Sequence, residues 1–270
     1  MRRRAVAVVV GAVLVAAGCA GTEQVVSAAA APTDLPSHLL GTWSVSGAGV
    51  PTGTRVAFSA VAMDVLMPCG TLDGSWDARP GGAFLADVHA ADPACREARS
   101  TLTLPWLDRA VSFRSVGKGR ELLDVQGGRV ARLRRWTPVV PGQPGPAQPV
   151  SLAARQAADT RPATLPAGLE PVGATDLVGA WAGEPGGAAV LQVDGEGTYR
   201  RVSGCWRGDG RWALSGPALL LAGAGWTWDS CAADRPVLVG RAGDTVVLVR
   251  ADGSTDDLHR VGPARAHAGS

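Results

Sequence analysis

The sequence predicts a mainly β protein made of two tandem small antiparallel β-barrel or roll modules, each with one internal disulfide. The cysteines support this, because Cys69 and Cys95 stand twenty-six positions apart, and so do Cys205 and Cys231. Identical spacing indicates a duplicated unit, in which each cysteine pair forms a disulfide within its own copy. Around the cysteines, Trp43, Asp73, Gly74 and Trp76 of the first copy correspond to Trp181, Asp209, Gly210 and Trp212 of the second.

The first copy consists of short predicted strands with one helical insert. Val56 and Phe58 alternate with small or polar neighbours, as in a half-buried strand. Asp73-Gly74 offers residues that accept positive φ in a tight hairpin turn. Pro105 to Arg109 has no counterpart in the second copy and predicts one helical turn. We therefore expect a β-rich α+β module.

The second copy is expected to be almost pure β. Residues 190–193 favour a strand that ends in a turn at 194–197, and residues 246–249 form a compact apolar run. Short strands at such close spacing are typical of antiparallel barrels and rolls. Further hairpin turns are predicted at Asp209-Gly210 and Asp252-Gly253.

Composition marks the domain boundaries. Five prolines between 138 and 149 prevent regular strand pairing and indicate a linker between the modules. The predicted segments are a signal peptide at 1–19, a flexible stalk at 20–37, module 1 at 38–136, a Pro/Gly/Ala-rich linker at 137–173, module 2 at 174–262 and a tail at 263–270. Modules this small benefit from a covalent staple, although four unpaired core cysteines are the alternative.

The amino terminus has the three parts of a secretory signal: Arg2-Arg3-Arg4, an apolar run at 5–17 and a small-residue exit at Gly18-Cys19. Once the two spaced pairs are satisfied, Cys19 is the cysteine left over. Its context resembles a bacterial lipobox, with Ala16 where leucine is preferred. We expect lipidation of Cys19 and a chain anchored on the outer face of the cell membrane, with plain cleavage or a free thiol as the alternative.

Net charge argues against a nucleic-acid partner. Without Arg2-Arg3-Arg4 the chain keeps 23 of its 26 basic residues against 24 acidic ones, a net charge of about −1. Arg129, Arg132, Arg134 and Arg135 nevertheless crowd the end of module 1. They are either the exposed side of a strand or a contact for anionic headgroups or cell-wall phosphates.

The residues assembled so far resemble the META domain (HslJ-like) family. Module 1 reads Gly41-Thr42-Trp43, then Cys69-Gly70-Thr71-Leu72-Asp73-Gly74-Ser75-Trp76, then Cys95. Module 2 reads Gly179-Ala180-Trp181, then Gly204-Cys205-Trp206, then Asp209-Gly210-Arg211-Trp212 and Cys231. The asparagine that follows the first cysteine in the family is Gly70 and Trp206 here, so no role of that side chain carries over. The resemblance implies small β-rich envelope domains.

The sequence contains no recognisable set of catalytic residues. The histidines are scattered and the cysteines are paired, so neither a metal site nor a cofactor is expected. Ser115 and Lys118 match Ser-x-x-Lys, but Gly117 and Gly119 indicate a hairpin tip rather than the helix that this motif needs. We therefore expect a protein that is not an enzyme.

The tryptophans divide into two groups. Those at matching places in both copies are best explained as core. Trp206, Trp226 and Trp228 are extra in module 2, and the last two share one face of a strand. They either fill the space of the missing helix or form a candidate stacking platform for a small-molecule, glycan or protein ligand.

The function expected from the sequence is that of a non-catalytic extracytoplasmic lipoprotein with tandem META-like domains, acting in ligand binding or envelope maintenance. An alternative is an inhibitor or decoy that blocks a secreted enzyme through a two-module surface. A hydrolase is less favoured, because no nucleophile, base and orienting residue can be named together.

Overall fold

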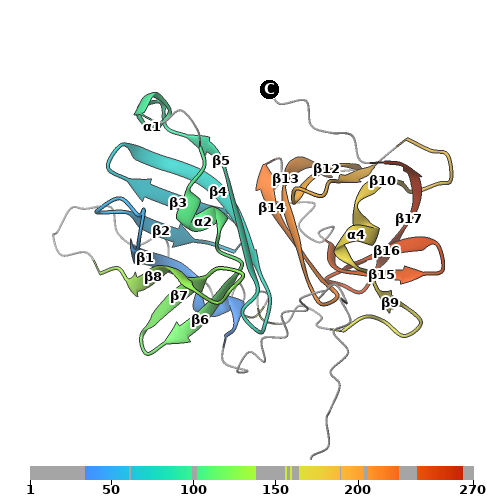
Figure 1. The fold of residues 1–270 in the computed structure, drawn as a ribbon, viewed down its shortest axis with the longest axis horizontal. Coiled ribbons are helices and arrows are strands. Elements are labelled where there is room, and N and C mark those ends of the chain that lie inside the picture. Colours follow the sequence, from blue (N-terminus) through green and yellow to red (C-terminus); the bar gives the residue numbers. More distant parts are fainter. Residues whose placement is uncertain are drawn as a thin grey trace, which may run out of the picture.

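The computed structural model describes residues 34–60, 62–98, 102–137, 156, 159, 164–188, 190–203, 206–224 and 236–263. Two curled antiparallel sheets stand side by side (Figure 1). This confirms the predicted fold class, a mainly β protein with two tandem barrel-like modules. Within these ranges, no helix has both the length and the apolar character needed to span a bilayer.

Module 1 is a closed barrel of eight strands, in the order β5-β4-β3-β2-β1-β8-β7-β6. An isolated bridge between Ala83 and Ser112 joins the two ends of the sheet. Its elements are η1 (Pro36–His38), β1 (Gly41–Ser46), β2 (Arg55–Phe58), β3 (Ala62–Met67), β4 (Gly70–Ala78), β5 (Phe84–Ala91), α1 (Pro93–Ala98), α2 (Pro105–Asp108), β6 (Ser112–Val116), β7 (Gly119–Leu123) and β8 (Arg129–Arg135).

Module 2 has the order β14-β13-β12-β11-β10-β17-β16-β15-β9, and β14 also meets β15 at Ala218 and Leu238. The short strand β9 (Glu170–Pro171) lies in the segment expected to be linker, yet it pairs with β15. The other elements are α4 (Ala174–Leu177), β10 (Gly179–Ala182), β11 (Leu191–Val193), β12 (Thr198–Ser203), β13 (Trp206–Ser215), β14 (Ala218–Ala224), β15 (Pro236–Ala242), β16 (Thr245–Arg250) and β17 (Thr255–Gly262).

Without β9, the strand order of module 2 repeats that of module 1 at every position, β1 corresponding to β10 and β8 to β17. The two modules therefore share one topology. Module 1 also contains the helix α2. Its Trp106 and Leu107 are buried in the core of the barrel, beside β5 and β8. The predicted helical turn at Pro105 is thus confirmed.

Turn predictions succeeded at Asp252-Gly253 and at 194–197, which join neighbouring strands. Those at Asp73-Gly74 and Asp209-Gly210 were wrong, because both pairs lie inside strands, β4 and β13. Glycine is needed there for close strand approach. A Cβ atom on Gly74 would lie 2.5 Å from the carbonyl oxygen of Asp87, and one on Gly210 would lie 2.1 Å from that of Ala222.

Candidate functional site

The predicted disulfide of module 1 is present. Cys69 and Cys95 are joined with an S–S distance of 1.94 Å, and their Cα atoms lie 4.8 Å apart. Cys95 is fully buried at the start of α1, while Cys69 follows β3. The bond ties α1 to the turn between β3 and β4, so it closes a loop within one module, as expected.

Several other predicted site residues lie outside the described residues. These are the lipidation candidate Cys19, the second cysteine pair Cys205 and Cys231, and two members of the tryptophan platform, Trp226 and Trp228. Trp206 begins β13, but its side chain is not described. All of these stay predictions.

The matched tryptophans are core residues in both modules. Trp43 and Trp181 are buried, and each donates its indole N–H to the carbonyl of the residue four positions earlier, Leu39 or Leu177. Trp76 and Trp212 are likewise buried. Their indole N–H groups donate to Ser59 and Asp194, each of which follows the second strand of its module.

An arginine covers each of the first tryptophans, and the sequence analysis missed it. Arg135 lies over the ring of Trp43 at 4.3 Å from the centroid, and Arg260 lies over Trp181 at 4.5 Å. Both pairs stand directly opposite each other across the first and last strands of their sheets. Each guanidinium donates 2.8 Å to a backbone carbonyl, that of Leu40 or that of Val178. We call this arrangement the arginine–tryptophan lock.

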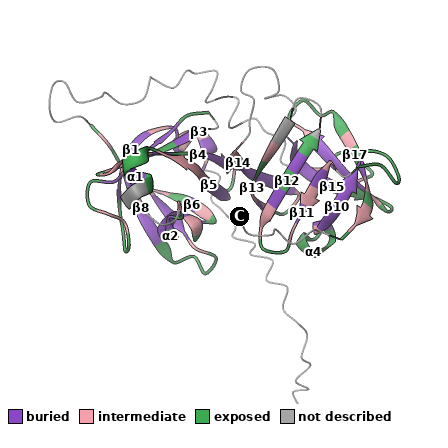
Figure 2. Cartoon of the chain, turned by 90° about the horizontal axis from the view of Figure 1, so that it is seen from above, coloured by how far each residue is buried: buried purple, intermediate pink, exposed green. Residues whose placement is uncertain are grey.

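The modules meet along a buried seam between β4 and β5 on one side and β13 and β14 on the other (Figures 1 and 2). Its apolar centre contains Leu85 and Leu220 with Ala222. Leu85 lies opposite Asp77, which follows Trp76, and Leu220 lies opposite Ala213, which follows Trp212. Equivalent leucines of the two modules therefore meet at the centre of the seam.

The polar contacts to β14 at this seam come from three side chains of module 1. The side chains of Ser75, Asp77 and Arg79 project from the end of β4 onto the edge of β14. Ser75 accepts from the N–H of Gly223, Asp77 accepts from that of Leu221 at 3.2 Å, and Arg79 donates to the carbonyl of Leu219. Three side chains two residues apart thus replace a neighbouring strand along β14.

Arg79 also bridges β14 and β15, which pair at Ala218 and Leu238. It donates to the carbonyl of Leu219 on β14 and, at 3.5 Å, to that of Val237 on β15. Its charge is balanced by an ion pair with Asp77, and both side chains are almost fully buried. This buried ion pair, with its hydrogen bonds to the backbone of module 2, fixes the position of one module relative to the other.

A second set of charges lies beside the seam. Arg211 of β13 donates to the carbonyl of Ala86 at 3.2 Å and to that of Asp108 at 3.0 Å, and its guanidinium lies 3.4 Å from the Asp108 carboxylate. Burial raises the pKa of Asp87 to about 6, opposed by Arg211 and reinforced by Asp108 and Asp209. Burial also raises the pKa of Asp108. Asp87 and Asp108 therefore share the guanidinium of Arg211.

The interior of module 2 contains a small hollow lined by Arg201 and apolar side chains, among them Leu191 and Trp212. It has room for about one water molecule. Arg201 is buried and pairs at 3.1 Å with Asp256, which also pairs with Arg250 at 2.6 Å. The hollow is too small for an organic ligand.

The remaining motifs do not gather into a reactive site. Ser115 lies on β6 and Lys118 lies in the turn of the β6–β7 hairpin, as expected, rather than on one face of a helix. Over the described part of the chain, no group of three His, Cys, Asp or Glu residues is placed to hold a metal ion. Neither a protein-family model, nor a curated protein, nor a solved structure matches this chain.

Proposed function

We propose that this chain is a non-catalytic extracytoplasmic lipoprotein, whose two META-like modules act in ligand binding or envelope maintenance at the outer face of the cell membrane. The observation that carries the proposal is the Cys69–Cys95 disulfide, with Cys95 fully buried in the core. Disulfides of this kind persist in oxidising compartments outside the cytoplasm. The signal-like first nineteen residues, which end at Cys19, the cysteine outside the two spaced pairs, agree with that location.

The seam adds a reason to favour a binding or scaffolding role. Asp77 and Arg79, two nearly buried charged side chains, bond to the backbone of the other module. They join two barrel-like bodies into one, so any surface that spans both modules is preorganised before a partner arrives. The same rigidity suits the alternative function, an inhibitor or decoy that blocks a secreted enzyme.

Cell fractionation tests the proposed anchor. The wild-type protein is expected in the membrane fraction with acyl chains on Cys19 by mass spectrometry, and the Cys19→Ser variant is expected in the medium. A wild-type chain that is secreted and carries no lipid contradicts the proposal. Inhibition of secreted hydrolases by the purified protein would favour the alternative.

The tryptophan platform is tested separately, because Trp226 and Trp228 lie outside the described residues. If the rings bind a ligand, Trp226→Ala costs about 1–3 kcal/mol of affinity and leaves the fold intact. If they are core, the same change costs about 3–5 kcal/mol of stability. Thermal unfolding of Trp226→Ala and Trp228→Ala distinguishes the two, and a large fall in melting temperature in both excludes the platform.

A further inference from the structure

The outer face of module 1 opposite the seam carries a row of arginines. On β6, β7 and β8, the register places Arg114, Glu121 and Arg132 next to one another. On β8, β1 and β2, it places Arg134, Ser44 and Arg55 next to one another. These residues alternate with core residues such as Phe113 and Leu133, so they share the outer side of the barrel.

This face has a large positive charge for its size. Glu121 is its one carboxylate in these rows and is only 5% exposed, because Arg114 at 2.7 Å and Arg129 at 3.0 Å cover it. The side chains of Arg114 and Arg129 are themselves 52% and 56% exposed. The two rows and the neighbouring Arg129 together hold five arginines and one carboxylate, a net charge of +4. We call this surface the basic face, formed by Arg55, Arg114, Arg129, Arg132 and Arg134.

An aromatic ring borders the basic face. Trp136 follows β8, where its backbone N–H donates to the carbonyl of Thr42. Arg55 lies over its ring at 4.7 Å from the centroid. The ring is partly exposed. Tryptophan beside arginine is typical of surfaces that meet the headgroup region of a bilayer, where one side of the ring is wet and the other apolar.

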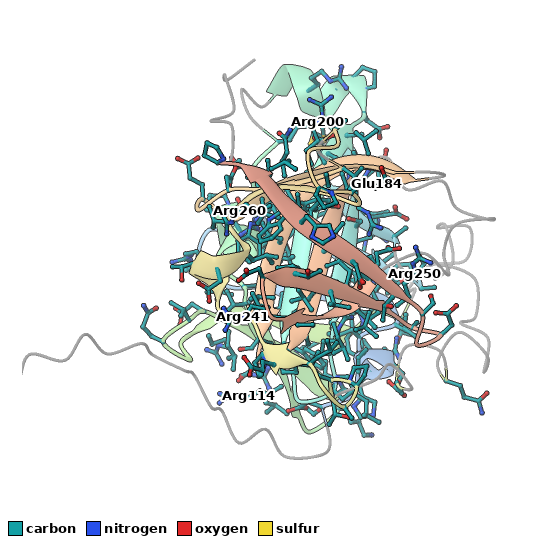
Figure 3. The ribbon with its side chains drawn as sticks, turned by 90° about the vertical axis from the view of Figure 1, so that its right-hand side faces the viewer. Arg114, Glu184, Arg200, Arg241, Arg250 and Arg260 are labelled. Carbon is teal, nitrogen blue, oxygen red and sulfur yellow. A yellow bond between two sulfur atoms is a disulfide. The ribbon has the colours of Figure 1, made fainter. Side chains whose placement is uncertain are left out.

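Module 2 provides an internal control, because the lock aligns its last strand with β8. The positions of Arg132 and Arg134 are taken by Asp257 and His259, and that of Glu121 by Val247. Val247 belongs to an apolar cluster that Leu165 and Leu169 cover. Figure 3 shows Arg200, Arg241, Arg250 and Arg260 spread apart over this module. The basic face is therefore a property of module 1 and not of the fold.

The chain enters module 1 at the edge of the basic face. Asp34 accepts a hydrogen bond of 2.6 Å from the backbone N–H of Ser115, the neighbour of Arg114 on β6. Fourteen residues separate Cys19 from Asp34, so the covalent reach between them is at most about 50 Å. The strands β7 and β8 lie on the side of module 1 away from module 2 (Figure 1). A tether at Cys19 lets this side turn towards the bilayer.

We propose that the basic face docks on the anionic lipid headgroups of the membrane in which Cys19 is anchored, an inference that rests on the proposed lipoprotein function. Each arginine near an anionic membrane surface strengthens binding roughly fivefold. The contact would hold module 1 against the bilayer and leave module 2 facing outward. Such binding weakens as salt rises, because exposed charges are screened.

Vesicle sedimentation tests the proposal with the unlipidated chain that starts at residue 20 and keeps both modules. The probes are phosphatidylcholine vesicles with and without 30% phosphatidylglycerol. We expect binding only to the anionic vesicles and its loss in high salt. The double variant Arg132→Gln/Arg134→Gln should bind roughly 25-fold more weakly. The matched control, Arg200→Gln/Arg241→Gln, removes the same charge from exposed positions of module 2 and should bind like the wild type.

Three outcomes overturn the proposal: no binding to anionic vesicles, equal loss in the two double variants, or tighter binding to soluble polyphosphate than to vesicles of equal phosphate content. The last would indicate an anionic polymer instead of a bilayer. Circular dichroism of each variant confirms that it is folded. Since the assay uses unlipidated protein, its failure leaves the Cys19 fractionation result standing, and the two proposals fail separately.

Discussion

Modules 1 and 2 share a strand order, two buried tryptophans and an arginine–tryptophan lock, yet they complete their sheets in different ways. Module 1 places its own α2 inside the barrel, beside β5 and β8. In module 2 the residues between Ala224 and Pro236 are not described, and Arg79 from module 1 bridges the strands β14 and β15. The modules therefore share a folding framework, and we infer that Arg79 of module 1 stabilises module 2.

The interiors differ in the same direction. Arg201 of module 2 occupies the position of Val65 in module 1, and Asp256 occupies that of Ala131. The core of module 1 is apolar at these places, whereas module 2 holds an ion pair between the buried Arg201 and the partly buried Asp256. A buried pair is rarely more stabilising than apolar residues of the same volume. Module 2 is therefore expected to be the less stable module on its own.

Removing Arg79 should have the largest effect. Arg79→Ala removes the guanidinium that pairs with the buried carboxylate of Asp77, and losing one partner of a buried ion pair costs about 3–5 kcal/mol. Hydrogen exchange should rise first in β14, whose edge the side chain covers. Urea unfolding and exchange mass spectrometry measure both effects, with Arg96→Ala on the exposed side of α1 as the control. The double variant Asp77→Ala/Arg79→Ala should recover part of the loss. Uniform protection of β14 in Arg79→Ala would show that module 2 closes without help.

Removing the disulfide should affect module 1 more than module 2. Cys69→Ser/Cys95→Ser reopens a loop of 26 residues and is expected to cost about 3–4 kcal/mol, chiefly by releasing the unfolded chain. Calorimetry of the oxidised wild type and the variant measures the difference. Peptide mapping without reductant tests the matching Cys205–Cys231 bond, and any Cys69–Cys205 link contradicts the two-module arrangement.

The seam should also make stability depend on pH. The pKa of Asp87 rises from 3.8 to about 6 in the folded protein, so folding favours its protonated form. This contribution is complete below about pH 4 and is lost as the pH rises through about 6, a change of about 2–3 kcal/mol. Asp87→Asn should remove that dependence and be more stable than the wild type at pH 8. Parallel stability curves for the two proteins from pH 4 to pH 8 would contradict the assignment.

Much of the framework was predictable from spacing, because duplication turns one sequence into its own comparison. The cysteine pair of module 1 and the matched tryptophans behave as predicted. The turns predicted at Gly74 and Gly210 were wrong, because a glycine needed for close strand approach has the same local sequence pattern as a turn glycine. The roles of Asp77 and Arg79 were not predictable, because they depend on how two separately folded sheets meet.

The arginine–tryptophan lock was predictable in principle. Its removal is expected to give the smallest loss of stability among these predictions. Aligning the last strands of the two copies places Arg135 and Arg260 at one position, each opposite a buried tryptophan. Loss of one cation–π contact costs about 0.5–1 kcal/mol at a partly exposed site. We expect Arg135→Ala and Arg260→Ala to lower stability by that amount, and by equal amounts if the lock belongs to the framework. Arg134→Ala, which leaves the lock intact, is the control.

Unequal losses would change the comparison between the modules. In module 1 a second guanidinium, that of Arg120, also lies over Trp43, at 5.5 Å from the ring centroid, and it remains when Arg135 is removed. Arg135→Ala would then cost less stability than Arg260→Ala, and replacing Arg120 as well should bring the two losses to the same size. That result would show that Arg120 takes over the contact with Trp43 when Arg135 is removed. Equal losses from the start would leave Trp43 and Trp181 held in the same way, and would confine the differences between the modules to the seam, the interior and the basic face.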